Sequence, residues 1–128
     1  MKEELLKNYG ISEPYTNQPE KWTKLCKSEV LNEAFIKKYK DFVNWNVISL
    51  NQKFSESFIE EFIDKLDWGS ICKSQTLSEE FIKKHADQVD WNRISTFQKL
   101  SEDFIEDYAD KVNWKYISTF QELSKDFI

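Results

Sequence analysis

The sequence predicts an all-α fold, a right-handed α-solenoid of about 4.5 tandem two-helix repeats with an N-terminal capping helix. The first observation is periodicity: the five tryptophans of the 128-residue chain follow one another at intervals of 23 residues without an insertion. The second is that the residues around each tryptophan recur with it. The third is that two glycines and two prolines leave few turns for an all-β fold. The tryptophans are Trp22, Trp45, Trp68, Trp91 and Trp114.

Each repeat is expected to contain two short helices, numbered here by position from its tryptophan. Phe-Ile recurs at positions +13 and +14 in all five units, from Phe35-Ile36 to Phe127-Ile128. A helix N-cap residue precedes this pair, and Asn or Asp precedes most of the tryptophans. The first set of caps is Asn32, Ser55, Ser78, Ser101 and Ser124, and the second is Asn44, Asp67, Asp90 and Asn113. Because isolated helices need roughly 12–15 residues, these helices must be stabilised by packing on neighbouring repeats.

Several polar residues recur with the repeat and are interpreted as scaffold. Glu or Gln stands at position +7, where it is expected to satisfy backbone groups between helices. Asp at position +19 is expected just past the first helix, where it could accept from backbone N–H groups or from a buried Trp indole. Position +4 holds only Cys or Ser, so Cys26 and Cys72 are expected to be packing residues without a disulfide. His85 takes a position that holds Tyr or Phe elsewhere, and is expected to pack likewise.

The two ends of the chain differ from the repeats. Residues 1–21 do not fit the period and are expected to form an N-terminal cap helix and loop, and residues 22–128 the tandem repeats. At the other end the sequence stops at Phe127-Ile128, a few residues into a first helix. Three explanations remain open: these residues tuck onto the previous unit, the array is a fragment, or the apolar end docks on a partner or a second copy.

The sequence gives no reason to expect catalysis. It has one histidine, no nucleophile paired with a base and no glycine-rich phosphate loop. Two cysteines cannot supply the four ligands of a structural zinc site, so no catalytic, cofactor-binding or metal residues are expected. No segment approaches the roughly 18 apolar residues of a membrane helix, and the first residues are no signal peptide. A cytoplasmic protein without a membrane partner is expected.

The charge pattern limits the partners. The net charge is -5 and Arg93 is the only arginine, so direct binding of nucleic acid is not expected. At positions +15 and +16 the sign alternates between units, which predicts modest ion pairs between neighbouring repeats, each worth about 0–1 kcal/mol. The four pairs are Lys37-Lys38, Glu60-Glu61, Lys83-Lys84 and Glu106-Asp107.

Candidate partner-binding residues are those that the scaffold does not require. Phe97 and Phe120 stand where earlier units have Asn51 and Ser74, and they are either extra core or exposed anchors of the kind common in binding hot spots. The second-helix candidates are Arg93, Phe97, Tyr116 and Phe120. The acidic candidates are Glu60, Glu61, Glu102, Asp103, Glu106 and Asp107. The candidates at the apolar end are Phe127 and Ile128.

The segment from Asp87 to Ile105 reads Asp-x-Val-Asp-Trp-x-x-Ile-Ser-x-x-Gln-x-Leu-Ser-Glu-x-Phe-Ile. This motif resembles the short Trp-containing helical repeats of uncharacterised proteins from large DNA viruses, phages and AT-rich bacteria, over residues 22–128. The resemblance implies a viral or phage setting and contact with a host protein, and it supplies no catalytic residues. The leading hypothesis is a non-enzymatic protein-interaction module. One alternative is a phage inhibitor of a host nucleic-acid-handling defence complex, of anti-CRISPR type and partly a nucleic-acid mimic. The other is a structural solenoid segment that self-associates as a homo-oligomer through its C-terminal end.

Overall fold

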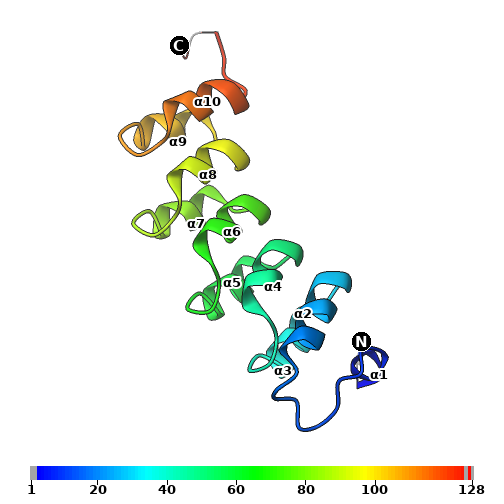
Figure 1. The fold of residues 1–128 in the computed structure, drawn as a ribbon. Helices are drawn as coiled ribbons and strands as arrows, with labels where there is room; N and C mark the ends of the chain where they lie inside the picture. Colours follow the sequence, from blue (N-terminus) through cyan, green and yellow to red (C-terminus); the bar gives the residue numbers. More distant parts are fainter. Residues whose placement is uncertain (1–2, 126, 128) are drawn as a thin grey trace. The chain divides into compact units, whose positions relative to one another are not determined.

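The computed structural model describes residues 3–125 and 127, and every regular element in these residues is a helix. The chain divides into two compact units, Met1–Asp67 and Trp68–Ile128. They are called unit 1 and unit 2 from here on, and each contains several of the 23-residue repeats. In both units, helices that begin at or contain a repeat tryptophan alternate with helices that carry Phe-Ile (Figure 1). The prediction of an all-α helical repeat is confirmed.

The helices are short in both units. Unit 1 contains α1 (Glu3–Asn8), α2 (Pro19–Ser28), α3 (Glu33–Lys38), α4 (Trp45–Asn51) and α5 (Glu56–Glu61). Unit 2 contains α6 (Trp68–Ser74), α7 (Glu79–Lys84), α8 (Trp91–Phe97), α9 (Glu102–Asp107) and α10 (Trp114–Phe120). The tryptophan helices pack against one another within each unit: α2 against α4 in unit 1, and α8 against both α6 and α10 in unit 2.

The helices begin where their cap residues predict. The Ser101 hydroxyl accepts the backbone N–H of Phe104 at 3.1 Å and so starts α9. The Asp90 carboxylate accepts the backbone N–H of Arg93 at 3.2 Å and starts α8. Each such cap satisfies one of the N–H groups that a helix start leaves without a partner, and typically contributes about 1 kcal/mol.

The core of each repeat is formed by the recurring apolar positions. In unit 2 the α9 pair Phe104 and Ile105 is buried, as is Ile94 of α8 and Leu100 of the connection. Adjacent residues such as Phe104 and Ile105 lie about 100° apart around a helix, so together they form one apolar face of α9. No helix buries this face by itself, so the stability of a repeat depends on the repeat beside it.

The glutamine at position +7 joins consecutive repeats, as predicted. Gln98 accepts the backbone N–H of Leu77 at 3.0 Å and donates to the carbonyls of Cys72 and Gln75 at 2.8 and 2.7 Å. Its side chain is therefore connected to three backbone groups of the preceding repeat. Gln52 in unit 1 and Gln121 in unit 2 make the equivalent three bonds. The acceptors lie near the end of a helix, where carbonyls lack partners within the helix.

A second connection between repeats was not foreseen from the sequence. The Glu79 carboxylate accepts both the backbone N–H and the hydroxyl of Ser101, at 2.7 and 3.0 Å. Glu33 binds Ser55 in the same way in unit 1. These glutamates are the first residues of α3 and α7, where an acidic side chain is favourable in any case, so the sequence alone does not reveal their bond to the next repeat.

The recurring aspartate at position +19 was interpreted only partly correctly. It lies beyond the first helix, as expected, but it is not the acceptor of the Trp indole. The indole N–H of Trp91 donates to the backbone carbonyl of Ala86 at 3.0 Å, and that of Trp114 to the carbonyl of Ala109 at 3.0 Å. A carbonyl in the turn before the aspartate already satisfies the indole, and Asp87 is exposed to solvent.

The N-terminal region covers the first repeat. Trp22 is only 2 % exposed, and its indole donates to the carbonyl of Tyr15 at 3.1 Å. The Tyr15 ring contacts the rings of Trp22 and Tyr39 edge-on. The helix that carries Trp22 begins earlier than the repeat predicts, at Pro19, because proline with its fixed φ is favoured in the first turn of a helix. Residues 1–21 therefore contribute the start of α2 as well as the expected cap helix α1.

Candidate functional site

The residues with reactive chemistry are used for packing. Cys26 and Cys72 are free and buried, and burial raises the pKa of the Cys26 thiol, which keeps it protonated and a poor nucleophile. The His85 ring lies 5.2 Å from the Trp68 ring and 4.6 Å from the Phe81 ring, measured between centroids, so it packs as predicted. In the part of the chain that the structure describes, no group of three or more His, Cys, Asp or Glu could hold a metal ion. None of the described helices is long and apolar enough to span a bilayer.

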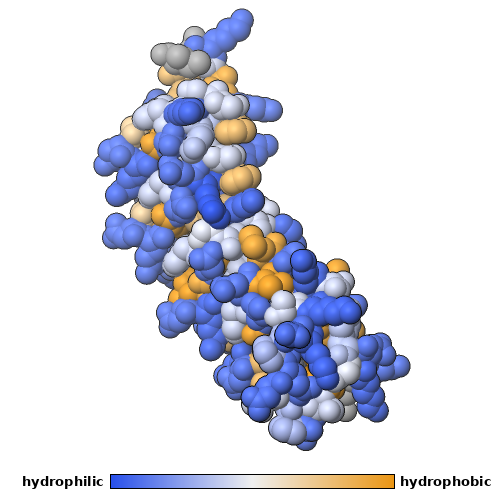
Figure 2. All heavy atoms as spheres, in the orientation of Figure 1, coloured by the Kyte–Doolittle hydropathy of each residue, from blue (hydrophilic) through white to orange (hydrophobic). Residues whose placement is uncertain are grey.

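Exposed aromatic side chains occur in unit 2. Among the described residues, three aromatic side chains leave about half of their surface open to solvent: Phe97 at 51 %, Phe120 at 56 % and Trp114 at 45 %. The two phenylalanines thus lie at the surface and are not extra core, which resolves the alternative that the sequence left open. On the face that Figure 2 shows, hydrophilic residues predominate and hydrophobic residues reach the surface in separate groups. Exposed aromatics on such a surface are candidates for recognition.

Phe97 and Phe120 belong to a surface on α8 and α10 that we call the aromatic face, defined by Arg93, Phe97, Tyr116 and Phe120. On each helix the two residues are four apart, so their side chains lie on one stripe. Tyr116 is half-buried, with its ring centroid 6.3 Å from that of Phe120. The side-chain amide of Asn113 donates to Asn92 at 2.8 Å, which fixes α10 beside α8. The four second-helix candidates from the sequence are therefore brought together on adjacent helices.

Basic residues lie on or close to the helices of the aromatic face. The Lys73 ammonium lies 5.7 Å from the centroid of the Phe97 ring, within the range of a cation–π contact. Lys115 is exposed on α10, and Lys99 is exposed two residues after the end of α8. The Arg93 guanidinium lies 3.5 Å from the carboxylate of Asp90 and remains partly exposed. The aromatic face thus combines apolar rings with charges that favour a partner carrying carboxylates.

The acidic candidates do not form one site. On α9 in unit 2, Asp103, Glu106 and Asp107 are exposed. Glu102 is instead a scaffold residue, because its carboxylate accepts the N–H and the hydroxyl of Ser124 at 2.5 and 2.9 Å.

The acidic candidates of unit 1 lie on α5. The carboxylate of Glu61 lies 3.1 Å from the ammonium of Lys37, both partly exposed, which is the ion pair that the alternating signs predict between neighbouring repeats. Glu60 is half-buried. Nothing in these contacts marks the two residues as a separate recognition surface.

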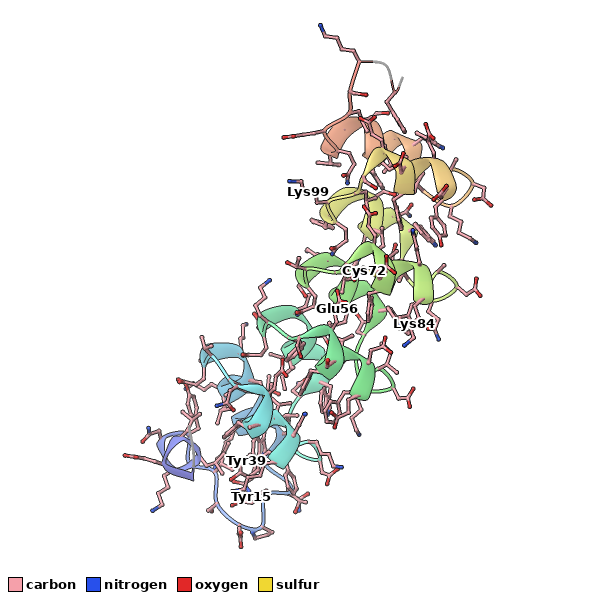
Figure 3. All side chains as sticks on the ribbon, turned by 180° about the vertical axis from the view of Figure 1, so that it is seen from behind. Tyr15, Tyr39, Glu56, Cys72, Lys84 and Lys99 are labelled. Carbon is pink, nitrogen blue, oxygen red and sulfur yellow. The ribbon has the colours of Figure 1, made fainter. Side chains whose placement is uncertain are left out.

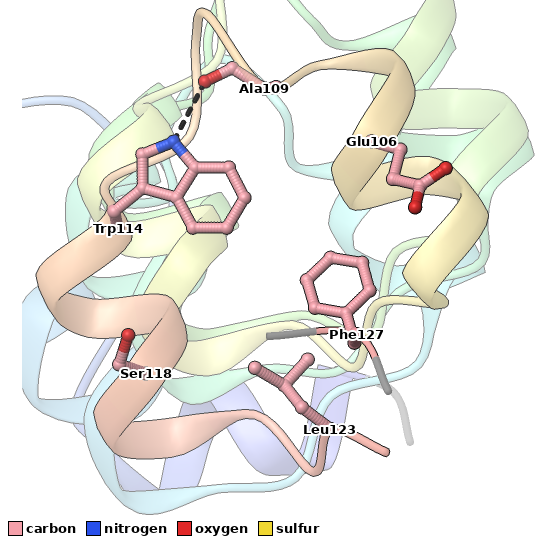
Figure 4. Close-up of a pocket in the computed structure, with 6 residues that line it drawn as sticks. All are labelled: Glu106, Ala109, Trp114, Ser118, Leu123 and Phe127. Atoms are coloured by element: carbon pink, nitrogen blue, oxygen red, sulfur yellow. Dashed lines mark hydrogen bonds between the residues drawn. The ribbon is translucent and has the colours of Figure 1, made fainter. Parts of the chain in front are cut away.

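A cavity opens beside Trp114 near the C-terminal end of unit 2 (Figure 4). Its volume is about 390 Å³. The lining residues are Glu106, Ala109, Trp114, Ser118, Leu123 and Phe127. The Phe127 ring stacks on the Trp114 ring with centroids 6.4 Å apart, so this candidate residue packs on its own repeat. Ile128, the other apolar candidate, lies outside the described residues.

The all-side-chain view shows polar and charged side chains projecting around both units (Figure 3). No family model, no curated protein and no solved structure matches the chain. Its function has to be argued from the aromatic face and the cavity themselves.

Proposed function

We propose that the chain is a non-enzymatic protein-interaction module of viral or phage origin, and that unit 2 binds a host protein through its aromatic face. The observation that carries this proposal is the exposure of Phe97 and Phe120 at a position where other repeats hold a polar residue. Asn51 and Ser74 occupy that position in α4 and α6, so the repeat folds without an aromatic ring there. The two rings serve something other than the fold.

The chemistry of the aromatic face suits a protein partner. Aromatic side chains and arginine contribute most of the binding energy in protein interfaces, especially where they cluster. Phe97 and Phe120 come from helices held side by side, so they lose little conformational freedom on binding. Lys73 beside the Phe97 ring and the exposed lysines of the same chain segments add attraction for an acidic rim on the partner.

Affinity purification from the native host, followed by mass spectrometry, tests this proposal. The wild-type chain is compared with a double variant, Phe97→Ser with Phe120→Asn, which installs residue types that other repeats already use at this position. A partner recovered by the wild type and lost by the double variant supports the proposal. The matched control is Asn46→Ser with Lys53→Ser in unit 1, two exposed changes that should retain the partner. Equal recovery of the partner by the wild type and the double variant would show that the aromatic face is not the binding surface.

A second candidate function is inhibition of a host nucleic-acid-handling defence complex through an acidic surface. The observation in its favour is that Asp103, Glu106 and Asp107 are exposed together on α9, which has no basic residue. Such a surface would compete for a basic groove of the host complex. Asp103→Lys with Asp107→Lys should then abolish inhibition in a reconstituted cleavage assay. Inhibition that survives this charge reversal rules the candidate out.

We also propose that the repeats wind in a right-handed α-solenoid and act in the host cytoplasm. The repeated glutamine bonds, which have the same sequence spacing in both units, support a regular arrangement of consecutive repeats within each unit, and the hand is the proposed part. A crystal structure of the chain tests the handedness directly, and fractionation of infected cells tests the location.

A further inference from the structure

Another cavity opens in unit 1, where the loop before α2 meets the turn after α3. Its volume is about 310 Å³. It is lined by the aromatic rings of Tyr15, Trp22 and Phe42, by the Asp41 side chain and by residues 16–19. None of these lining residues is cationic, so the cavity combines apolar walls with one negative charge. Such a cavity suits a ligand group that has an apolar surface and a positive charge.

Phe42 distinguishes the first repeat from the others. An aspartate occupies position +19 in four repeats, but only in the first repeat is the next residue aromatic. The residues at position +20 are Phe42, Lys65, Gln88 and Lys111. The repeat therefore folds without an aromatic ring at this position, and the ring of Phe42 places apolar surface beside the carboxylate of Asp41.

The three rings of the cavity lie close together. The Phe42 ring lies 5.8 Å from the Trp22 ring and 5.4 Å from the Tyr15 ring, measured between centroids. Trp22 is buried, whereas Tyr15 and Phe42 are half-buried and leave part of their surface to solvent. A ring beside them already holds a cation, because the Lys38 ammonium lies 5.4 Å from the centroid of Tyr39, which packs on Tyr15 (Figure 3). Aromatic rings of this kind attract a cation to their faces.

The Asp41 carboxylate is open to a ligand. It is exposed, and it makes no hydrogen bond or ion pair with any residue that the structure describes. A free carboxylate can accept two parallel hydrogen bonds from the guanidinium group of arginine. A guanidinium group also stacks flat on aromatic rings and is less strongly hydrated than the ammonium group of lysine. Arginine therefore matches both the rings and the charge of the cavity.

The loop that forms the other wall of the cavity is held by its own hydrogen bonds. The side-chain amide of Gln18 donates to the carbonyls of Pro14 and Ser12 at 2.6 and 2.9 Å. Asn17 has a φ of 62°, in the left-handed region, which asparagine adopts more readily than most residues. The indole of Trp22 donates to the carbonyl of Tyr15 at 3.1 Å and joins the loop to α2. Because the wall is formed in advance, a ligand has little ordering of the chain to bring about.

We infer that this cavity binds the side chain of an arginine in a partner polypeptide. The guanidinium stacks on the half-buried rings of Tyr15 and Phe42 and donates two hydrogen bonds to Asp41. A polypeptide is favoured over free arginine because no lining residue is cationic, so nothing in the cavity would hold the carboxylate of a free amino acid. The site shares no residue with the aromatic face of unit 2, so the two proposals stand or fall separately.

The test titrates Nα-acetyl-arginine amide, which has no free carboxylate, into the full ¹⁵N-labelled chain. The backbone N–H signals of Asn17 and Phe42 should shift at millimolar ligand, while the signal of Lys65 in the next repeat stays in place. Nα-acetyl-citrulline amide has nearly the same shape without the charge and should bind several-fold more weakly. Nα-acetyl-lysine amide has the charge without the planar group and should also bind several-fold more weakly.

Substitutions assign the binding to this cavity. Asp41→Asn should weaken the binding of the arginine amide by about two- to fivefold, the effect of losing one exposed ion pair. Asp64→Asn is the matched control, since this exposed residue has the same position in the next repeat, and it should leave the affinity unchanged. Phe42→Gln installs the residue of the third repeat and should weaken binding by a similar factor. If Phe42→Gln also destabilises the N-terminal cap, Asp41→Asn decides, because its side chain is exposed.

Four results would overturn the inference. The first is that the signals of Asn17 and Phe42 do not respond to the arginine amide. The second is that Asp41→Asn and Asp64→Asn bind it equally well. The third is that the amide of lysine or of trimethyl-lysine binds as tightly as that of arginine. The fourth is that the same signals shift with protein concentration alone, which would make Arg93 of a second copy the occupant.

Discussion

Phe97 and Gln98 are neighbours in the chain and belong to two different regions of unit 2. Gln98 is 5 % exposed and joins its repeat to the preceding one through three hydrogen bonds. Phe97 is 51 % exposed, and the Lys73 ammonium lies 5.7 Å from the centroid of its ring. The same helix end thus carries a position that the repeat requires and a position that the repeat leaves free. A scaffold of constant inner positions can present different outer residues without loss of its fold.

Replacement of Gln98, which joins two repeats, should lower the unfolding free energy more than the other substitutions below. Gln98→Ala leaves the Leu77 N–H and the carbonyls of Cys72 and Gln75 without their partner in a buried place, and we expect a loss of roughly 3–5 kcal/mol in unfolding free energy. Urea denaturation followed by circular dichroism measures it. Thr96→Ala on the same helix is the control and should change the free energy by no more than about 0.5 kcal/mol. Similar losses in both variants would erase the distinction between inner and outer positions.

Loss of a helix cap should lower the unfolding free energy by an intermediate amount. Ser101→Ala removes the hydroxyl that caps α9 and that also donates to Glu79. We expect a loss of about 1–2 kcal/mol in unfolding free energy, measured in the same denaturation experiment. Ser57→Ala, an exposed change inside α5, should be neutral or slightly stabilising because alanine favours helix. A neutral Ser101→Ala would mean that the connection between repeats does not depend on this serine.

A smaller, pH-dependent effect is expected at the N-terminal cap. The Tyr9 hydroxyl donates to the Glu29 carboxylate, and this hydrogen bond raises the pKa of Tyr9 above its ordinary value of 10.0. The folded chain therefore holds this proton more tightly than the unfolded chain, so the contribution is complete below pH 10 and is lost as the pH rises through the folded pKa. As the pH rises above 10, the melting temperature of the wild type should therefore fall more steeply than that of Tyr9→Phe. Parallel curves for the two proteins would show that the contact does not couple to folding.

The sequence was sufficient for most of the scaffold because the repeat places the same residue in the same surroundings several times. The caps and the role of Gln98 could be predicted, since polar residues that recur inside an apolar pattern have to satisfy backbone groups. The acceptor of the Trp91 indole N–H could not be predicted. It is a backbone carbonyl, and because every residue carries one, no side chain in the sequence marks it. The bond from Glu79 to Ser101 was hidden by a simpler explanation, the favourable position of an acid at a helix start.

The candidate site was harder to predict than the scaffold. Phe97 precedes a buried glutamine on a helix of only seven residues, and a pattern that short does not show which face the ring takes. The cavity beside Trp114 could not be predicted either, because its lining residues come from α9, from α10 and from the turns around them, and no recurring pattern marks them as one site.

The most direct test of the division between scaffold and recognition surface is the unfolding free energy of the double variant Phe97→Ser with Phe120→Asn. If the two rings lie outside the core, as the structure has them, the free energy stays within about 0.5 kcal/mol of the wild type. A loss of about 3 kcal/mol or more, the effect of removing a buried phenylalanine, would contradict the account and return both residues to the core.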